Sequence, residues 1–283
     1  MATLIWNRRL DGMDKINVIK VGGAVVENEA SLKELINQFA TMPGYKVLVH
    51  GGGRSATKIA AQLGIESHMV GGRRITDEDM LQVVTMVYGG LVNKRIVAAL
   101  QAKGVNAVGL TGADMDIIRS HKREPKMVTM DDGGQQLVDF GYVGDVDSAN
   151  GRRLAALIKP QEGVEAVVPV VAPLTHDGKG NILNTNADTM AATVAKALTE
   201  EFEVTLTYCF EKPGVMADAD DDDSVIPTIN TESYAQLKAD GIVSGGMIPK
   251  LDNAFDSISS GVKRVVITHF MDIEASMGTV IEK

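Results

Sequence analysis

Four short motifs combine lysines, a carboxylate and glycine-rich turns in a way that suits the transfer of a phosphoryl group. They are residues 18–23 (VIKVGG), 50–53 (HGGG), 184–188 (NTNAD) and 244–250 (SGGMIPK). Phosphoryl transfer needs mainly positioning and positive charge around the moving group, which backbone N–H groups and lysine ammonium groups supply. Each glycine turn alone is a weak indication, because a Gly-Gly pair after an apolar run is commonly just a tight turn. The combination predicts a phosphoryl-transfer site.

Apolar strands and amphipathic helices must position these motifs. A β-branched run at 16–21, a helical spacing of apolar residues at 32–39 and a second run at 46–49 predict a βαβ opening. The glycine turn at 51–53 leads into a helical pattern at 54–63. The turn is therefore expected between a strand end and a helix N-terminus, where an anion is favoured.

The rest of the chain continues the alternation. Further strands are predicted at 105–110, 164–171, 204–210 and 262–268, and further helices at 77–103 (with Thr76 as N-cap), 188–198 and 251–260. The polar segment 117–143 is expected to form a β-hairpin or an excursion from the main sheet. The pattern predicts an α/β protein with a mainly parallel sheet.

Composition excludes several classes of function. The 283 residues carry a formal net charge of −9, which disfavours non-specific binding to nucleic acid or to an anionic membrane. No stretch approaches the roughly 20 uninterrupted apolar residues of a membrane span, and the N-terminus lacks the apolar region of a signal peptide. With Cys209 as the single cysteine, no intrachain disulfide can form. We expect a cytoplasmic globular protein.

Lys20 and Asp188 are the residues whose positions are easiest to interpret. Lys20 ends an apolar strand beside Gly22 and Gly23, and ligands of open α/β sheets bind at the carboxyl ends of the strands. The alternative is a lysine whose stem merely covers apolar surface. For Asp188 the alternative is an N-cap or first-turn acid of the following helix.

Five motifs, in order, resemble the amino acid kinase family. They are Lys-x-Gly-Gly (20–23), His-Gly-Gly-Gly (50–53), Gly-x-Arg-x-Thr-Asp (72–77), Asn-x-Asn-Ala-Asp (184–188) and Gly-Gly-Met-x-x-Lys (245–250). The resemblance implies a three-layer αβα sandwich that uses ATP and Mg²⁺. It also implies an N-terminal lobe, residues 1–180, for binding an acylated amino acid and for dimerisation, and a C-terminal lobe, residues 181–283, for ATP.

The resemblance assigns catalysis to Lys20, Lys250 and Asp188. The two lysines would flank the γ-phosphoryl group, and Asp188 would lie between them. This assignment is physically reasonable, because two facing ammonium groups repel each other and a shared carboxylate keeps both charged. The attacking carboxylate is already ionised at neutral pH, so no general base is needed.

The resemblance assigns the amino-acid substrate to Gly23, Gly52, Gly53, Arg74 and Asn184. The glycine N–H groups would meet the γ-carboxylate and the phosphoryl group. The Arg74 fork would grip the α-carboxylate, and Asn184 would add a hydrogen bond. The alternatives are an ordinary surface arginine and an ordinary turn residue.

The nucleotide side is less well specified. By resemblance it comprises Glu211, Lys212, Gly214, Val215, Ser244, Gly245 and Gly246. Glu211 stands where the family usually has Asp, and the preceding 208–210 is atypical. The acidic run 218–223 is interpreted as solvated, and no metal-ligating side chains are predicted, since Mg²⁺ in the family is held largely by phosphates.

Within the family, the motifs are similar to those of kinases that phosphorylate the γ-carboxylate of an N-acylated glutamate in arginine synthesis. We predict N-acetyl-L-glutamate as the acceptor, and N-succinyl-L-glutamate is the closest alternative. The patterns of aspartokinase, glutamate 5-kinase and carbamate kinase fit less well. A protein of another class, a sensor that binds nucleotide or arginine without turnover, is a further alternative. About fifteen residues precede the first strand, so we expect a homodimer without the N-terminal helix that links dimers of arginine-inhibited members into rings.

Overall fold

The elements of the chain follow the alternation that the sequence predicts. The computed structural model describes residues 12–129, 133–160, 165–218, 220–245, 247–273 and 278–283. Its strands are β1 Lys15–Val21, β2 Tyr45–His50, β3 Met69–Val70, β4 Arg73–Arg74, β5 Ala107–Leu110, β6 Ile118–Lys122, β7 Lys126–Thr129, β8 Gln135–Val138, β9 Gly144–Ala149, β10 Val168–Val171, β11 Leu174–His176, β12 Ile182–Asn184, β13 Glu203–Phe210, β14 Thr228–Ile229, β15 Arg264–His269 and β16 Thr279–Ile281. Its helices are α1 Gly23–Glu27, α2 Glu29–Thr41, α3 Gly53–Gln62, α4 Glu78–Val84, the π-helix η1 Thr85–Val92, α5 Asn93–Gln101, the short 3₁₀ turn η2 Asp114–Asp116, α6 Gly151–Ile158, α7 Ala187–Leu198, α8 Thr231–Ala239 and α9 Met247–Ser259.

A single eight-stranded sheet runs through the molecule in the order β14-β16-β15-β13-β1-β2-β10-β5. The strands from β15 to β5 are parallel, and β16 pairs antiparallel with β15. In this register Lys20 lies between Tyr208 of β13 and Val49 of β2. The carboxyl ends of β1, β2 and β13 therefore meet at one edge of the sheet, where parallel sheets bind ligands.

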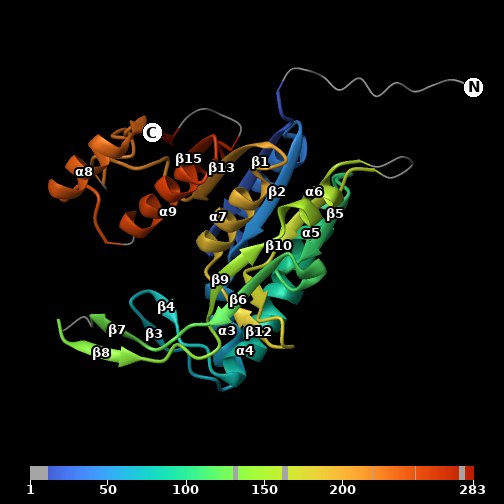
Figure 1. Cartoon of the computed structure of the whole chain (residues 1–283), viewed down its shortest axis with the longest axis vertical. Coiled ribbons are helices and arrows are strands. Elements are labelled where there is room, and N and C mark those ends of the chain that lie inside the picture. The colour runs from blue at the N-terminus through green and yellow to red at the C-terminus, as the bar shows by residue number, and fades with distance from the viewer. Residues whose placement is uncertain (1–11, 130–132, 161–164, 219, 246, 274–277) are drawn as a thin grey trace, which may run out of the picture.

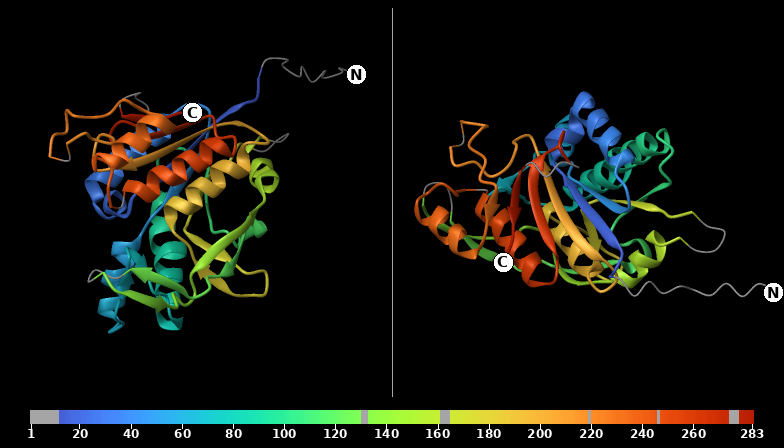
Figure 2. Two further views of the ribbon diagram at one scale, coloured as in Figure 1. Left: turned by 60° about the vertical axis from the view of Figure 1, so that its left-hand side comes forward. Right: turned by 90° about the horizontal axis from the view of Figure 1, so that it is seen from above.

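Helices cover both faces of this sheet and make the predicted three-layer αβα sandwich (Figures 1 and 2). One face packs against α1, α2, α3 and the α4–α5 run, and the other against α6, α7 and α9. Successive side chains of β1 point to opposite faces of the sheet, as in any strand. Val18 belongs to the core on the α7 side, and Ile19 belongs to the core on the α2 side. Lys20 thus points to the same side as Val18, toward α7.

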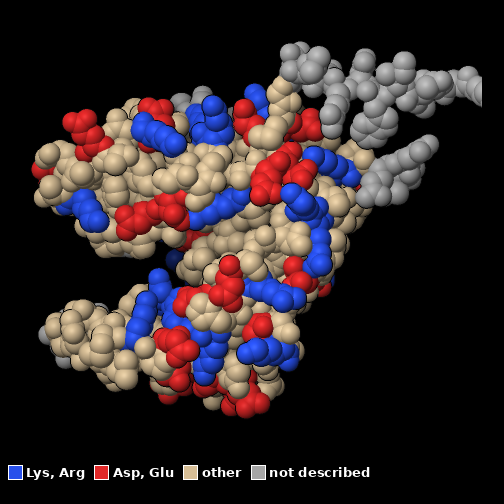
Figure 3. Space-filling model, in the orientation of Figure 1, with Lys and Arg blue, Asp and Glu red and all other residues tan. Residues whose placement is uncertain are grey.

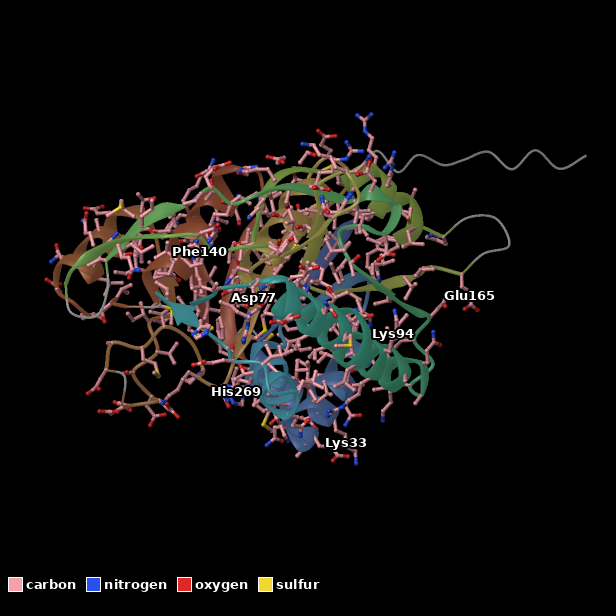
Figure 4. All side chains as sticks on the ribbon, turned by 90° about the horizontal axis from the view of Figure 1, so that it is seen from below. Lys33, Asp77, Lys94, Phe140, Glu165 and His269 are labelled. Atoms are coloured by element: carbon pink, nitrogen blue, oxygen red, sulfur yellow. The ribbon has the colours of Figure 1, made fainter. Side chains whose placement is uncertain are left out.

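A second sheet and two hairpins lie at one end of the molecule. The sheet has the order β12-β11-β6-β9, and the hairpins are β3–β4 and β7–β8 (Figure 1). The antiparallel β7–β8 pair confirms the predicted hairpin within 117–143. Phe140, labelled in Figure 4, follows β8 and is buried with Val138 and Val143 in a small core of its own.

The helical run after Thr76 differs from the single helix predicted for 77–103. It is α4, then the π-helix η1, then α5, and its cap is Asp77, whose carboxylate accepts from the Met80 N–H at 2.8 Å. Figure 4 labels Asp77 at the start of this run and Lys94 further along it. The prediction of Thr76 as N-cap was wrong, because its backbone pairs with Phe140 and Tyr142 like a strand residue.

The same run, Glu78–Gln101, is long and apolar enough to span a membrane by length and composition alone. It is the one helix with those properties in the described part of the chain. Its apolar side chains, among them Val83, Val87 and Ile96, belong to the core on the α2 side of the sheet. It is therefore placed as a core helix of the sandwich, a kind of helix that commonly has this composition.

Candidate active site

Two glycine turns meet at the carboxyl ends of β1 and β2. A Cβ atom built on Gly51 would lie 3.1 Å from the backbone nitrogen of Gly23, and one built on Gly23 would lie 3.6 Å from that of Gly52. A side chain at Gly51 would crowd the facing turn, whereas one at Gly23 would make an ordinary contact with it. Because the turns are so close, their backbone N–H groups lie near one another. The N–H groups of Gly53 and Arg54 belong to the same region, since these residues begin α3. Such an arrangement can bind an anion.

His50 and Asn93 support the glycine turn at 51–53 from the protein interior. His50 is fully buried, and its Nδ1 lies 2.7 Å from the Gly51 carbonyl oxygen. The Asn93 amide contacts His50 Nε2 at 3.2 Å and donates to the Val170 carbonyl at 2.9 Å. Burial lowers the pKa of His50 to about 4, so the ring is neutral and carries its proton on Nδ1 toward the carbonyl. These contacts give His50 a structural role at the strand end.

The predicted catalytic residues Lys20 and Asp188 form an ion pair in the interior. Lys20 Nζ lies 2.8 Å from Asp188 Oδ1, and the two side chains are 8% and 17% exposed. The N-cap of α7 is Asn186, whose side chain accepts from the N–H groups of Asp188 and Thr189. Asp188 is therefore not the N-cap but a first-turn acid, the other half of the stated alternative, and its carboxylate also pairs with Lys20.

Lys250 lies in the first turn of α9, which begins at Met247 and so starts earlier than the predicted 251. Burial lowers the pKa of Lys250, and the positive charge of Lys20 lowers it as well, whereas the negative charge of Asp188 raises it. The three groups are therefore close enough to influence one another's charge. Lys250 Nζ lies 4.2 Å from the centre of the Phe210 ring, and Lys20 Nζ lies 5.0 Å from the same centre. The structure thus brings Lys20, Lys250 and Asp188 together.

Phe210 is a neighbour of this cluster that the sequence interpretation did not assign. It ends β13, next to β1 in the sheet, and its ring stacks at 6.4 Å on Tyr208. The only signal in the sequence was that segment 208–210 departs from the family pattern. An aromatic face attracts cations, so the ring gives both ammonium groups a common contact.

The five predicted substrate-binding residues all line one cavity of about 250 Å³ beside the glycine turns. They are Gly23, Gly52, Gly53, Arg74 and Asn184. Figure 3 shows the hollow that crosses this face between the part carrying α8 and α9 and the part carrying the two hairpins. The volume suits a small molecule rather than a polymer.

Arg74 is buried, so the surface-arginine alternative was wrong. One terminal nitrogen donates to the Gly53 carbonyl and to Thr57 Oγ1, both at 2.8 Å, and the other contacts Ser67. Arg74 therefore holds the start of α3 as well as lining the cavity. Asn184 is also buried, and its amide donates to Thr76 Oγ1 at 2.9 Å.

Sequence interpretation missed other residues that line this cavity, notably Tyr88, Arg123 and Asp145. Tyr88 comes from the π-helix, and its ring would lie 2.9 Å from a Cβ atom on Gly52. Burial raises the pKa of Tyr88. A π-helix is not visible in the apolar periodicity of a sequence, although such segments are frequent at functional sites.

The predicted nucleotide side is more open. Glu211 and Phe210 line a second hollow of about 320 Å³, which shares Gly23 and Gly53 with the substrate cavity. Ser244 and Gly245 lie exposed just before α9, where helix N–H groups favour an anion. Gly246, also predicted there, lies outside the described residues. The two hollows meet at the glycine turns.

Gly214, Val215 and Lys212 make internal contacts. The Val215 N–H donates to Thr279 Oγ1 at 2.8 Å, and a Cβ atom on Gly214 would meet the same oxygen at 2.8 Å. Lys212 pairs with Asp222 at 2.8 Å in the acidic loop. These residues shape the loop after β13, and direct contact with a nucleotide stays a prediction.

Comparisons with known proteins show which family the chain resembles. The model of the amino acid kinase family matches residues 15–269. The chain is 61% identical over 270 residues to an acetylglutamate kinase of Bacteroides thetaiotaomicron and 60% identical to one of Phocaeicola vulgatus, and each match covers 95% of this chain and 99% of the relative. Among solved structures, a protein of Streptococcus mutans superposes with a TM-score of 0.73 at 25% identity, covering 94% of this chain and 98% of that one. This chain belongs to the amino acid kinase family.

Proposed function

We propose that the protein transfers the γ-phosphoryl group of ATP to the γ-carboxylate of N-acetyl-L-glutamate, a step of arginine biosynthesis. The observation that carries the proposal is the buried Lys20–Asp188 pair, which shares its environment with Lys250 beside two converging glycine turns. The relatives named acetylglutamate kinase, which match over their full length, support the acetyl group over the succinyl alternative.

In the proposed mechanism, the chain acts through position and charge. The reacting groups, a carboxylate and a polyphosphate, are both anionic and repel each other. Lys20 and Lys250 offset that repulsion, because positive charge held in a desolvated site stabilises charge that moves during transfer. Asp188 orients Lys20 and favours the charged form of Lys250 despite its burial. Transfer is direct, with no covalent enzyme intermediate.

The substrates are proposed to occupy the two hollows that share Gly23 and Gly53. The acylglutamate lies in the cavity lined by Arg74 and Asn184. Arg74 belongs to the proposed substrate lobe, residues 1–180, and Asn184 to the first residues of the proposed lobe 181–283. ATP lies toward Glu211 and the N-terminus of α9, with Mg²⁺ held largely by its phosphates. Carboxylates of the 218–223 run cap their own loop, as Asp218 accepts from the Asp220 N–H at 3.0 Å. A cytoplasmic homodimer remains part of the proposal.

The test is ATP-dependent formation of an acyl phosphate, trapped with hydroxylamine, on N-acetyl-L-glutamate and N-succinyl-L-glutamate side by side. Faster turnover of the acetyl compound is expected. Turnover of neither compound, together with ATP binding, would favour the sensor alternative. The pairing of Lys20 with Asp188 speaks against that alternative, because a sensor has no need of a buried pair at the phosphoryl position.

A further inference from the structure

Arg123 follows β6 and lines the substrate cavity, and one of its three nitrogens makes no hydrogen bond to the described residues. Its Nε donates to Asp145 at 3.0 and 3.1 Å, and its Nη2 contacts the same carboxylate. The third nitrogen, Nη1, is buried and has no hydrogen-bond partner among the described residues. A buried donor left unpaired costs free energy, so such groups are normally satisfied, and a ligand is one way to satisfy them.

The surroundings of Arg123 are cationic. Arg73 lines the same cavity, and its positive charge lowers the pKa of the nearby Lys126. Burial lowers the pKa of each, and the Arg123 charge lowers both further, while Asp145 alone opposes the effect. Arg73, Arg123 and Lys126 thus share a single nearby carboxylate, that of Asp145. A carboxylate of the ligand would balance the remaining positive charge.

Arg74, the residue that the family resemblance assigns to the α-carboxylate, has fewer unpaired donors for a ligand than Arg123 has. Both of its terminal nitrogens already donate to Gly53, Thr57 and Ser67. Arg123 instead has its side chain fixed by Asp145 on one edge and by the Phe140 ring, whose centre lies 5.5 Å from its guanidinium carbon. Its remaining nitrogen is held in place for a second anion.

We propose that Arg123, supported by Arg73 and Lys126, forms a carboxylate-binding subsite of the substrate cavity and sets the affinity for the acceptor. This inference rests on the proposed function. The carboxylate has two possible sources, the α-carboxylate of the glutamate or a carboxylate at the end of the acyl chain, as in a succinyl group. An acetyl group is neutral and supplies only the first.

The experiment measures KM and kcat of Arg123→Gln for N-acetyl-L-glutamate, N-succinyl-L-glutamate and ATP. Loss of one charge-assisted hydrogen bond predicts a rise of about ten- to a hundredfold in KM for the acceptor, with little change in kcat or in KM for ATP. The double variant Arg123→Gln/Asp145→Asn removes the carboxylate that the single change leaves unpaired, and it should show the same rise.

Arg119→Gln is the matched control. Arg119 lies on β6, just before Arg123 in the chain, and makes a similar two-nitrogen pair with Asp116, at 2.6 and 2.9 Å, but it does not line the substrate cavity. This variant is expected to keep the wild-type KM for both acceptors. An equal rise of KM in the Arg119 and Arg123 variants would overturn the proposal, since it would indicate a general disturbance of the strand.

The two acceptors distinguish the sources. A KM rise for both acceptors assigns the subsite to the α-carboxylate, and a rise for N-succinyl-L-glutamate alone assigns it to the acyl chain. Unchanged KM for both acceptors in the single and double variants overturns the subsite but leaves the kinase intact. Wild-type protein that turns over neither acceptor would instead contradict the proposed function, so the two failures are distinguishable.

Discussion

The two sides of the candidate site are built differently. On the substrate side, the glycine turn is held by His50 and Asn93, and Arg74 and Asn184 are buried with protein partners. On the nucleotide side, Ser244, Gly245 and the loop after β13 are largely exposed. The substrate side is pre-organised by the core of the protein, whereas on the nucleotide side Val215 is packed but Ser244 and Gly245 are exposed.

This difference indicates where rigidity matters for the proposed reaction. The acceptor carboxylate must be aligned closely with the phosphoryl group, and alignment of that kind lowers the barrier only when the supporting residues do not move. A triphosphate can be bound by flexible backbone N–H groups and ordered on binding. Changes on the substrate side should therefore cost more than similar changes on the nucleotide side.

The largest effect is expected for Lys20→Ala, where the two sides meet. Removing this charge leaves Asp188 buried without its partner at 2.8 Å and takes a stabilising cation from the phosphoryl group. We expect kcat to fall about 10²- to 10³-fold, as for the loss of one electrostatic stabiliser. Lys33→Ala, which changes an exposed lysine on α2 labelled in Figure 4, is the control and should behave as wild type. Near-normal turnover of Lys20→Ala would contradict the mechanism.

Gly52→Ala tests the rigidity of the substrate side. The added Cβ would lie 2.9 Å from Cδ1 of the Tyr88 ring, so the turn or the ring must shift. Overpacking of this kind costs about 1–3 kcal/mol, and kcat/KM for the acceptor should fall at least tenfold. Gly90→Ala in η1, whose Cβ would meet nothing within 4 Å, should leave the kinetics unchanged and raise the stability by about 0.5–1 kcal/mol, because alanine favours a helix over glycine. If the two variants behave alike, the turn is less constrained than its packing indicates.

The neutral, buried His50 makes the support of the turn sensitive to acid. Its folded-state pKa of about 4 lies below the ordinary 6.5, so the unfolded chain binds more protons between these values. The free energy of unfolding should therefore fall as the pH drops from 6.5 toward 4, by about 3 kcal/mol in all from this group. Urea unfolding at several pH values measures the slope, which His50→Asn should flatten.

His121→Asn is the control for this titration. His121 is exposed, and its bond to Asp147 raises its pKa, so its contribution is present at low pH and lost as the pH rises. His121→Asn should therefore leave the decrease in the free energy of unfolding between pH 6.5 and pH 4 in place. An unchanged slope in His50→Asn would mean that other groups govern the acid sensitivity.

Much of the substrate side could be predicted from sequence, because its motifs follow strands with clear apolar patterns. The βαβ opening, the turn at Gly51–Gly53 and the position of Lys20 depend on neighbours close in the chain. Residues that reach the site from distant segments could not be predicted in this way. Asn93 contacts His50 from 43 positions away, and Arg123 enters the cavity from a polar segment without helical or strand periodicity.

Local rules also failed where two of them competed. Thr76 and Asp77 are both good N-cap residues, and the choice of Asp77 depends on the pairing of Thr76 with Phe140 and Tyr142, which no local pattern reveals. Helix α9 begins at Met247 despite Pro249, since proline is tolerated in the first turn of a helix. That earlier start places Lys250 within the helix and fixes its direction toward Phe210.

The smallest effect is expected for Phe210→Leu, at the border of the two sides. The ring contacts both ammonium groups, 4.2 Å from Lys250 Nζ and 5.0 Å from Lys20 Nζ, and a cation over an exposed aromatic face gains about 0.5–1 kcal/mol. Leucine keeps the apolar volume but not the aromatic face, so kcat should fall about fivefold with KM for the acceptor unchanged. Phe255→Leu, a half-buried phenylalanine on α9 that stacks on Tyr234, controls for lost packing. A rise in KM for ATP without a change in kcat would instead place the ring on the nucleotide side alone, because the two lysines would then be held without it.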